Sequence, residues 1–279
     1  MAGMPLPFDV VPLRLEFRAS GELYFPPGKA SNILRGAFGM ALPRVADTAG
    51  AALFDPQPDG PGPSGLADPP RPFVFRVRHL DGRRIRAGEP FTVGLNLFTL
   101  DSVAREIAVR AFDDAGREGF GPGRGKAELC GATGDPISLD LSPGDAADRV
   151  RVEFLTPTEL KHEGRLAERP EFGILAARLR DRIGALRAFY GAGPLPIDFA
   201  AFGARAATVR MTSCELRTVD LERRSSRTGQ THPIGGFLGV AEYAGDLPEF
   251  LPYLEAARWT GVGRQAVWGK GELTVSRIM

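Results

Sequence analysis

Cysteine and histidine are scarce in this chain of 279 residues, which has two cysteines and three histidines. Cys130 and Cys214 lie far apart in the sequence, so they cannot build a disulfide framework or, by themselves, a zinc site. We interpret both as core thiols of a protein in a reducing cytosol. We expect neither a metal nor a cofactor.

The chain also has almost no net charge and no long apolar run. Lys and Arg total 35 against 34 Asp and Glu, a formal charge of +1, so any nucleic-acid surface must be local. No run of 18 apolar residues is present, and the N-terminus MAGMPLPFDV lacks the basic and apolar regions of a signal peptide. We therefore expect a cytoplasmic protein without membrane contact.

A glycine-rich loop, GVGRQAVWGKGEL at residues 261–273, is the most informative segment. It fails the Walker pattern, because five residues separate Gly263 from Gly269 and a glycine follows Lys270. It also fails the dinucleotide pattern, because only a short strand remains after Ala266 where a whole βαβ unit is needed. Glycine lets backbone amides approach a ligand closely. The loop therefore predicts a surface for a phosphate-bearing partner.

The N-terminal half predicts the order β-α-β-β-α-β. Its first strand alternates apolar and charged residues over 13–18, and a helix follows over 29–42. A Pro/Gly-rich stretch over 55–72 predicts a mobile loop. Strands over 73–80 and 91–100 come next, then a helix capped by Asp101 or Ser102. A glycine-containing loop over 119–129 leads into the last strand.

The C-terminal half repeats that order. An alternating strand over 149–154 precedes a helix with an apolar stripe from Phe172 to Tyr190. Two strands follow over 208–221 and 234–243. Asp246 and Glu249 have the spacing of a capping box for the last helix, which the opening loop and a final strand complete.

The two glycine loops occupy equivalent places in the two halves. Residues 125–129 (GKAEL) align with residues 269–273 (GKGEL), and each segment lies between the second helix and the last strand. The match predicts a duplicated βαββαβ unit, with domains over 1–142 and 143–279. Coincidence between two glycine-rich turns is the open alternative.

Four segments of the sequence resemble the CRISPR-associated endoribonucleases of the RAMP superfamily, which cut precursor CRISPR RNA within its repeats. These segments are FPPGKASNILRGAFGMAL (25–42), FLTPTELKHEGRL (154–166), HPIGGFLGVAEYAGDLPEFLPYL (232–254) and the glycine-rich loop (261–273). The resemblance implies an α+β fold of two tandem ferredoxin-like domains, each an antiparallel sheet with helices on one face. It also implies metal-free cleavage to 2′,3′-cyclic phosphate and 5′-hydroxyl ends. Repeat RNA would be the partner, and CRISPR effector subunits and a homodimer stay open.

Catalysis of this kind needs a base, an acid and a cation near the phosphate. Family members usually supply a histidine near the first helix, but His79, His162 and His232 all lie elsewhere. We expect His79 to be buried or at a sheet edge. The catalytic candidates are Tyr24, Lys29 and His162, with ordinary surface or packing roles as the alternative.

The RNA-binding candidates come from the glycine-rich loop and from a basic hairpin. Trp268 could stack on a base or pack against the last helix. The charges of Arg264 and Lys270, like those of the hairpin, suit phosphate contacts. The full set is Gly261, Gly263, Arg264, Trp268, Gly269, Lys270, Gly271, Arg223, Arg224, Arg227 and His232.

Two other functions remain open at this point. The missing first-helix histidine favours a non-catalytic RAMP subunit that holds guide RNA in an effector complex. The near-neutral net charge fits a duplicated ferredoxin-like module that binds a small ligand or a protein.

Overall fold

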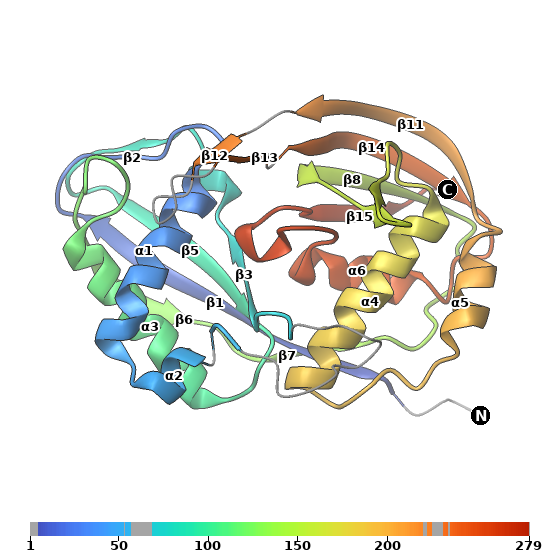
Figure 1. The fold of residues 1–279 in the computed structure, drawn as a ribbon, viewed down its shortest axis with the longest axis horizontal. Helices are drawn as coiled ribbons and strands as arrows, with labels where there is room; N and C mark the ends of the chain where they lie inside the picture. Colours follow the sequence, from blue (N-terminus) through green and yellow to red (C-terminus); the bar gives the residue numbers. More distant parts are fainter. Residues whose placement is uncertain are drawn as a thin grey trace.

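Two antiparallel sheets lie side by side in the computed structural model of this chain (Figure 1). The structure describes residues 5–52, 54–56, 69–219, 222–224, 231–233 and 235–278. Each sheet carries the predicted βαββαβ order and has its two main helices on one face, so the fold is a tandem pair of ferredoxin-like domains. We call these the N-terminal and C-terminal lobes. None of the helices in the described part of the chain has the length and apolar character needed to cross a bilayer.

The N-terminal lobe is built on a sheet with the strand order β3-β5-β1-β6. Its main elements are β1 (Pro7–Ala19), α1 (Ala30–Val45), β3 (Phe73–Arg76), β5 (Pro90–Leu97), α3 (Ser102–Glu118) and β6 (Ala127–Thr133). Smaller elements are β2 (Leu23–Tyr24), α2 (Thr48–Ala52), the 3-10 turn η2 (Arg78–Leu80), β4 (Arg84–Ile85) and β7 (Ile137–Asp140). In β1, Leu13 and Leu15 are buried while Arg14 and Glu16 are exposed, which confirms the predicted alternation. Asp101 accepts a hydrogen bond from the Val103 amide (2.8 Å) and caps α3 as predicted.

The C-terminal lobe is built on a sheet with the strand order β11-β14-β8-β15. Its main elements are β8 (Arg149–Thr158), α4 (Phe172–Tyr190), α5 (Phe199–Ala206), β11 (Arg210–Val219), β14 (Gly236–Ala244), α6 (Leu251–Thr260), the 3-10 turn η3 (Ala266–Trp268) and β15 (Leu273–Arg277). Short pairs are β9 (Lys161–His162) with β10 (Arg165–Leu166), and β12 (Glu222–Arg224) with β13 (Thr231–Pro233). The predicted apolar stripe of α4 is buried against α6 and the sheet, through Leu175, Leu179 and Ile183 among others.

Several sequence predictions about local structure were wrong. The strand predicted over 73–80 ends at Arg76, and His79 lies exposed in η2, where its Nε2 is 3.0 Å from the Thr92 carbonyl oxygen. The capping box of α6 does not form, because the helix begins at Leu251 with Phe250 at the N-cap, so both Asp246 and Glu249 lie before it; Glu249 bonds Arg205 (2.6 Å).

The helix α5 was not predicted, and Cys130 is exposed rather than a core thiol, whereas Cys214 is half-buried. Most of the predicted mobile loop, residues 57–68, lies outside the described residues.

The two lobes share packing across their junction. Strand β1 begins beneath the C-terminal lobe, where Phe8 and Val10 join the apolar core formed by α4 and α6 (Figure 1). Val74 and Phe98 of the N-terminal sheet join the same core. The apolar contact therefore holds the N-terminal sheet against the helices of the C-terminal lobe.

The C-terminal end of α6 is held by hydrogen bonds from polar side chains of both lobes. Arg76 of β3 donates to the carbonyls of Trp259 (2.8 Å) and Arg258 (3.1 Å), and Asn96 of β5 also donates to Trp259 (2.9 Å). Arg182 of α4 donates to the Thr260 carbonyl (2.8 Å). The last carbonyls of a helix have no partner within it and carry its negative dipole end. These contacts fix where the chain enters the glycine-rich loop.

Both docking arginines are half-buried. Burial lowers the pKa of Arg76 to about 10, against a smaller opposing effect of Glu272. Burial also lowers the pKa of Arg182 to about 9, and the charge of Arg76 adds to that effect. Both guanidinium groups therefore stay protonated at neutral pH, and their cost of burial is offset by the helix carbonyls.

Replacing Arg76 with alanine would remove the side-chain donor of the Arg258 carbonyl and one of the two side-chain donors of the Trp259 carbonyl. We expect Arg76→Ala to lower the free energy of unfolding by about 2 kcal/mol or more, measured by urea denaturation. The control is Arg14→Ala on the solvent face of β1, which should change it by less than about 0.5 kcal/mol. Equal values for the two variants would contradict the docking role of Arg76.

Candidate functional site

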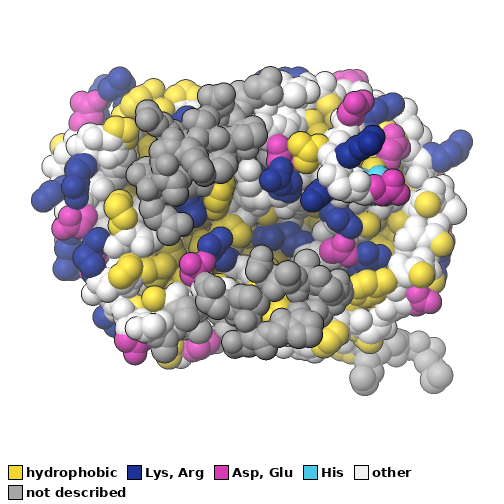
Figure 2. Space-filling model, in the orientation of Figure 1, with side chains coloured by type: hydrophobic (Ala, Val, Ile, Leu, Met, Phe, Trp, Pro, Cys, Tyr) yellow, Lys and Arg dark blue, Asp and Glu magenta, His cyan; other side chains and the backbone are white. Residues whose placement is uncertain are grey.

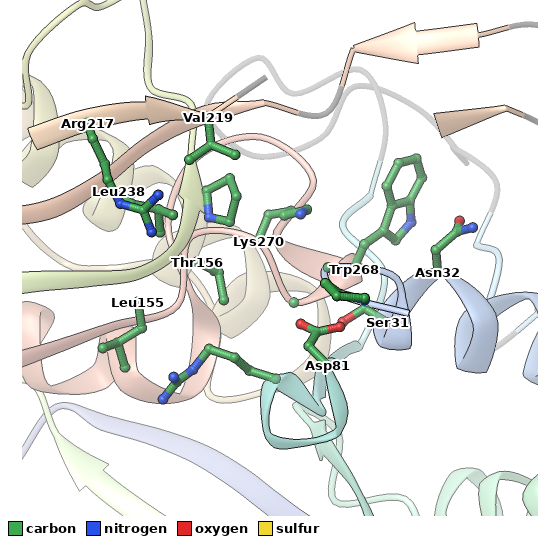
Figure 3. Close-up of a pocket in the computed structure, with 15 residues that line it drawn as sticks. Ser31, Asn32, Asp81, Leu155, Thr156, Arg217, Val219, Leu238, Trp268 and Lys270 are labelled. Atoms are coloured by element: carbon green, nitrogen blue, oxygen red, sulfur yellow. The ribbon is translucent and has the colours of Figure 1, made fainter. Parts of the chain in front are cut away.

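A cavity of about 340 Å³ opens between the lobes, beside the glycine-rich loop. Six chain segments line it (Figure 3): Pro27, Gly28, Ser31 and Asn32 near the start of α1; Arg78 and Asp81 around η2; Leu155, Thr156 and Pro157 of β8; Arg217 and Val219 of β11; Leu238 of β14; and Trp268, Gly269 and Lys270 of the loop. Its lining has three cations, Arg78, Arg217 and Lys270, and one carboxylate, Asp81. On this face of the molecule, Lys and Arg side chains gather in the hollow between the lobes (Figure 2). A nearly neutral chain can bind nucleic acid only through a local basic surface, and this hollow is such a surface.

Helix α1 is capped by a residue from another segment. The Asp81 carboxylate accepts a hydrogen bond from the Ala30 amide (2.9 Å), whereas Lys29 at the N-cap position offers no side-chain cap. Burial raises the pKa of the Asp81 carboxyl, outweighing the lowering effects of the Ala30 amide and the Lys270 ammonium. Asp81 thus ties the turn after β3 to the first turn of α1.

Lys270 is the buried cation of the cavity, with 9% of its surface exposed. Burial lowers the pKa of Lys270, the charge of Asp81 raises it, and the charge of Lys29 lowers it further. Lys29 does not line the cavity but is close enough for this electrostatic effect. Two lysines from different lobes therefore converge near the start of α1, with Asp81 partly balancing their charge.

The glycines of the loop give it its path. Gly263 has φ 78°, and a Cβ there would lie 2.2 Å from the Glu159 carbonyl oxygen; Gly271 has φ 66°, and its Cβ would lie 1.8 Å from that of Val262. Only glycine fits at both places. The amides of Gly261, Gly269 and Gly271 donate to carbonyls within the lobe, not towards the cavity. The expected phosphate contact therefore depends on side chains of the loop.

The loop touches the first helix directly. A Cβ at Gly269 would lie 2.8 Å from the Ser31 Oγ and 3.1 Å from the Phe75 carbonyl oxygen, so the absence of a side chain permits this close approach. The Arg35 guanidinium of α1 lies over the Trp268 ring, 4.5 Å from its centroid. Trp268 thus packs on the first helix rather than the last, and it still borders the cavity.

Three other candidates lie away from the cavity lining. Tyr24 is 40% exposed and stacks with Arg84 at 4.5 Å. His162 is exposed on β9 near Glu163 (3.8 Å) and borders a separate depression beside α4. Arg264 pairs with Glu159 (3.3 Å). The structure therefore brings together Lys29, Trp268, Gly269 and Lys270 but not these three.

The basic hairpin forms the short pair β12 and β13. Arg223 faces His232 in the backbone register, and Arg224 faces Thr231. In Figure 1 the pair lies near the start of α1. Arg227 lies outside the described residues.

Most of the lining residues were missed in the sequence, and among them are the polar residues Ser31, Arg78, Asp81 and Arg217. They come from three separate segments, and only the folded chain places them together. Arg217 carried a weak signal in the sequence, because a charged residue beside the apolar Leu216 is typical of the exposed face of a strand. In the structure Arg217 is exposed and Leu216 is half-buried. Asp81 carried none, since its hydrogen-bond partner is 51 residues away.

Comparison with known proteins finds a family match in each half of the chain. The family model of the CRISPR-associated endoribonuclease Cas6 matches residues 152–273, which include the wall formed by β8, β11 and β14 and the whole glycine-rich loop. The C-terminal part of the chain therefore matches the Cas6 family. A second family model, described as an N-terminal domain, matches residues 6–137. No curated protein sequence matches the chain.

Solved Cas6 structures share the fold over nearly the full length. The chain is similar to Cas6 from Thermus thermophilus, with 19% identity, a TM-score of 0.59, and coverage of 99% of this chain and 100% of that one. It is similar to a Cas6 product complex, with 20% identity, a TM-score of 0.62, and coverage of 96% and 99%. It is also similar to a RAMP protein binding different RNA substrates, with 15% identity, a TM-score of 0.50, and coverage of 96% and 100%.

The Asp81 cap can be tested by two substitutions. Asp81→Ala removes the acceptor for the Ala30 amide and should cost about 1 kcal/mol, a drop of a few degrees in Tm. Asp81→Asn keeps an acceptor for this hydrogen bond and should lose less stability than Asp81→Ala. Because burial raises the pKa of Asp81, the stability that its protonated form provides is lost as pH rises through that pKa, and the Asn variant escapes this loss. Equal melting of Asp81→Ala and wild type at neutral pH would show that the cap contributes nothing.

Proposed function

We propose that this chain is a member of the Cas6 family and a metal-independent endoribonuclease that binds precursor CRISPR RNA and cuts it within its repeats. The products are 2′,3′-cyclic phosphate and 5′-hydroxyl ends. One observation carries the proposal: the buried Lys270 of the glycine-rich loop faces the start of α1 across a cavity between the lobes. The match of residues 152–273 to the endoribonuclease family supports it.

The chemistry needs no group beyond the RNA and the protein side chains. The 2′-oxygen attacks the adjacent phosphorus and loses its proton, the P–O5′ bond breaks, and the 5′-oxygen takes up a proton. Negative charge builds on the phosphoryl oxygens between these steps. Lys270 and Lys29, from opposite lobes, supply positive charge to those oxygens, and the dipole of α1 adds to it. A lysine with a lowered pKa is also suited to giving a proton to the leaving oxygen.

The RNA-binding surface extends from the cavity along the loop and the hairpin. Trp268, held by Arg35, offers a ring beside the cavity for a base. Arg264 and the hairpin residues Arg223, Arg224, Arg227 and His232 are proposed to contact the RNA backbone. The loop glycines, Gly261, Gly263, Gly269 and Gly271, set the path of the loop that carries Arg264, Trp268 and Lys270. Repeat RNA is the proposed partner, and effector subunits and a second copy of the chain are further partners to test.

A second candidate function is a RAMP subunit that holds guide RNA without cutting it. The observation in its favour is that no histidine is among the described residues that line the cavity. Both functions use the same RNA surface, so cleavage separates them.

The deciding experiment is incubation with the repeat RNA of the source genome in EDTA. A single cut that leaves a cyclic phosphate supports the proposed nuclease. Tight binding without a cut supports the guide-holding subunit instead. Absence of binding contradicts both.

Loss of Lys270 should reduce cleavage strongly. We expect Lys270→Ala to lower the single-turnover rate at least about 100-fold, in line with the loss of one charge-stabilising group. The control is Lys126→Ala, because Lys126 holds the equivalent place in the first glycine loop and is exposed. Lys29→Ala, Tyr24→Ala and His162→Ala are compared in the same assay. An unchanged rate in all three would remove the catalytic assignments of these residues.

RNA affinity should fall at high pH through Lys270. Because burial lowers the pKa of Lys270, its charge is lost at a lower pH than that of an exposed lysine, and its contribution to phosphate binding falls with it. The arginine of the Lys270→Arg variant stays charged, so the RNA affinity of this variant should change less than that of wild type from neutral pH to about pH 9.5. Binding is measured with repeat RNA that has 2′-deoxynucleotides at the cut. Identical pH profiles for both proteins would contradict this role.

A further inference from the structure

The cavity has two chemically different sides. Lys270, Asp81 and Ser31 lie on one side, whereas Leu155, Val219 and Leu238 lie on the other beside Arg217 (Figure 3). The aliphatic side chains are half-buried, so each keeps surface open to the cavity. A polar ligand group thus has a place on the first side and an apolar one on the second.

The apolar side belongs to the sheet of the C-terminal lobe. Leu238 of β14 lies directly opposite Arg217 of β11 in the register, and β8, which carries Leu155, is the next strand. The polar atom of Thr156 is already engaged, since its Oγ1 accepts from the Glu272 amide (2.9 Å). Strand backbones fix these positions, so this wall is present before any ligand arrives.

Arg217 is the polar group available on that side. It is exposed, and it has no ion-pair partner within the part of the chain that the structure describes. A guanidinium can donate to acceptors on a base edge or lie flat on its face. Aliphatic surface with one such donor suits the flat face and polar edge of a nucleobase.

We propose that Leu155, Val219, Leu238 and Arg217 form a subsite for one unpaired nucleobase next to the phosphate held by Lys270. This inference rests on the proposed function. The volume of about 340 Å³ is near the lower end of small-ligand pockets and is enough for one base with its sugar. In the proposed complex the nucleotide beside the cut lies outside any helix, which places the cut where the repeat is single-stranded or can be opened.

A second groove on the N-terminal lobe was weighed for the same role. It lies between α1 and the loop after α3, and its cations are Arg44 and Arg124. Arg44 pairs with Asp114, and Arg124 pairs with Glu118 (3.0 Å). Their charge is locally balanced, so the cavity between the lobes is the better place for a nucleotide.

The test combines an abasic scan of the RNA with substitution of Leu238. In wild type, removing the base of one nucleotide next to the cut should lower kcat/KM about tenfold or more, because a stacked base is lost. In Leu238→Ala the same abasic RNA should be cut almost as fast as intact RNA. Val240→Ala, two residues along β14 and outside the cavity lining, should behave like wild type. Leu238→Met keeps the apolar surface and should retain the wild-type response.

The outcomes separate this inference from the proposed function. If wild type cuts the repeat but responds equally to every abasic position, the base subsite is contradicted while the nuclease stands. If Leu238→Ala and Leu238→Met both respond like wild type, the assignment of the wall is wrong. If wild type binds the repeat without cutting it, the effect of each abasic position is measured on the Kd instead of on kcat/KM. If it does not bind, both proposals fail.

Discussion

The site depends on the carbonyl end of α6. Arg76 and Asn96 from the N-terminal sheet and Arg182 from α4 all bond to the last carbonyls of that helix. The chain turns into the glycine-rich loop immediately afterwards, so the loop inherits its position from this contact. Gly269 then reaches Ser31, and Lys270 comes to lie near the capped start of α1. The two lobes thus make one cavity because a helix end needs hydrogen-bond partners that the other lobe supplies.

Charge is used locally in a chain that is almost neutral overall. Surface arginines are largely matched with carboxylates, as in Arg205 with Glu249, and the cavity between the lobes keeps an excess of cations. Asp81 moderates that excess and at the same time caps α1. Buried charge is costly unless partners offset it, and here both the helix ends and the opposite lobe provide them. A polyanion that enters the cavity meets positive groups already held in place.

The sequence predicted the order of elements well because that order follows local pattern. The alternation in β1, the stripe of α4 and the Asp101 cap are interactions within a few residues, and all three were confirmed. The glycine-rich loop was also found, but not the reason for its glycines, which is contact with Glu159 and Val262. Asp81 and Arg217 were missed because their roles depend on distant segments. The predicted capping box does not form because α6 begins at Leu251, after both of its residues, and Glu249 pairs with Arg205 of the unpredicted α5.

We propose that the two lobes form one RNA site around Lys270. The most direct measurement is a structure of the protein bound to repeat RNA that carries a 2′-deoxynucleotide at the cut, so that the 2′-oxygen nucleophile is absent. We expect the phosphate at the cut to lie within hydrogen-bond distance of the Lys270 Nζ and near the first turn of α1. A complex in which the RNA lies outside this cavity, with that phosphate far from both lobes' lysines, would contradict it.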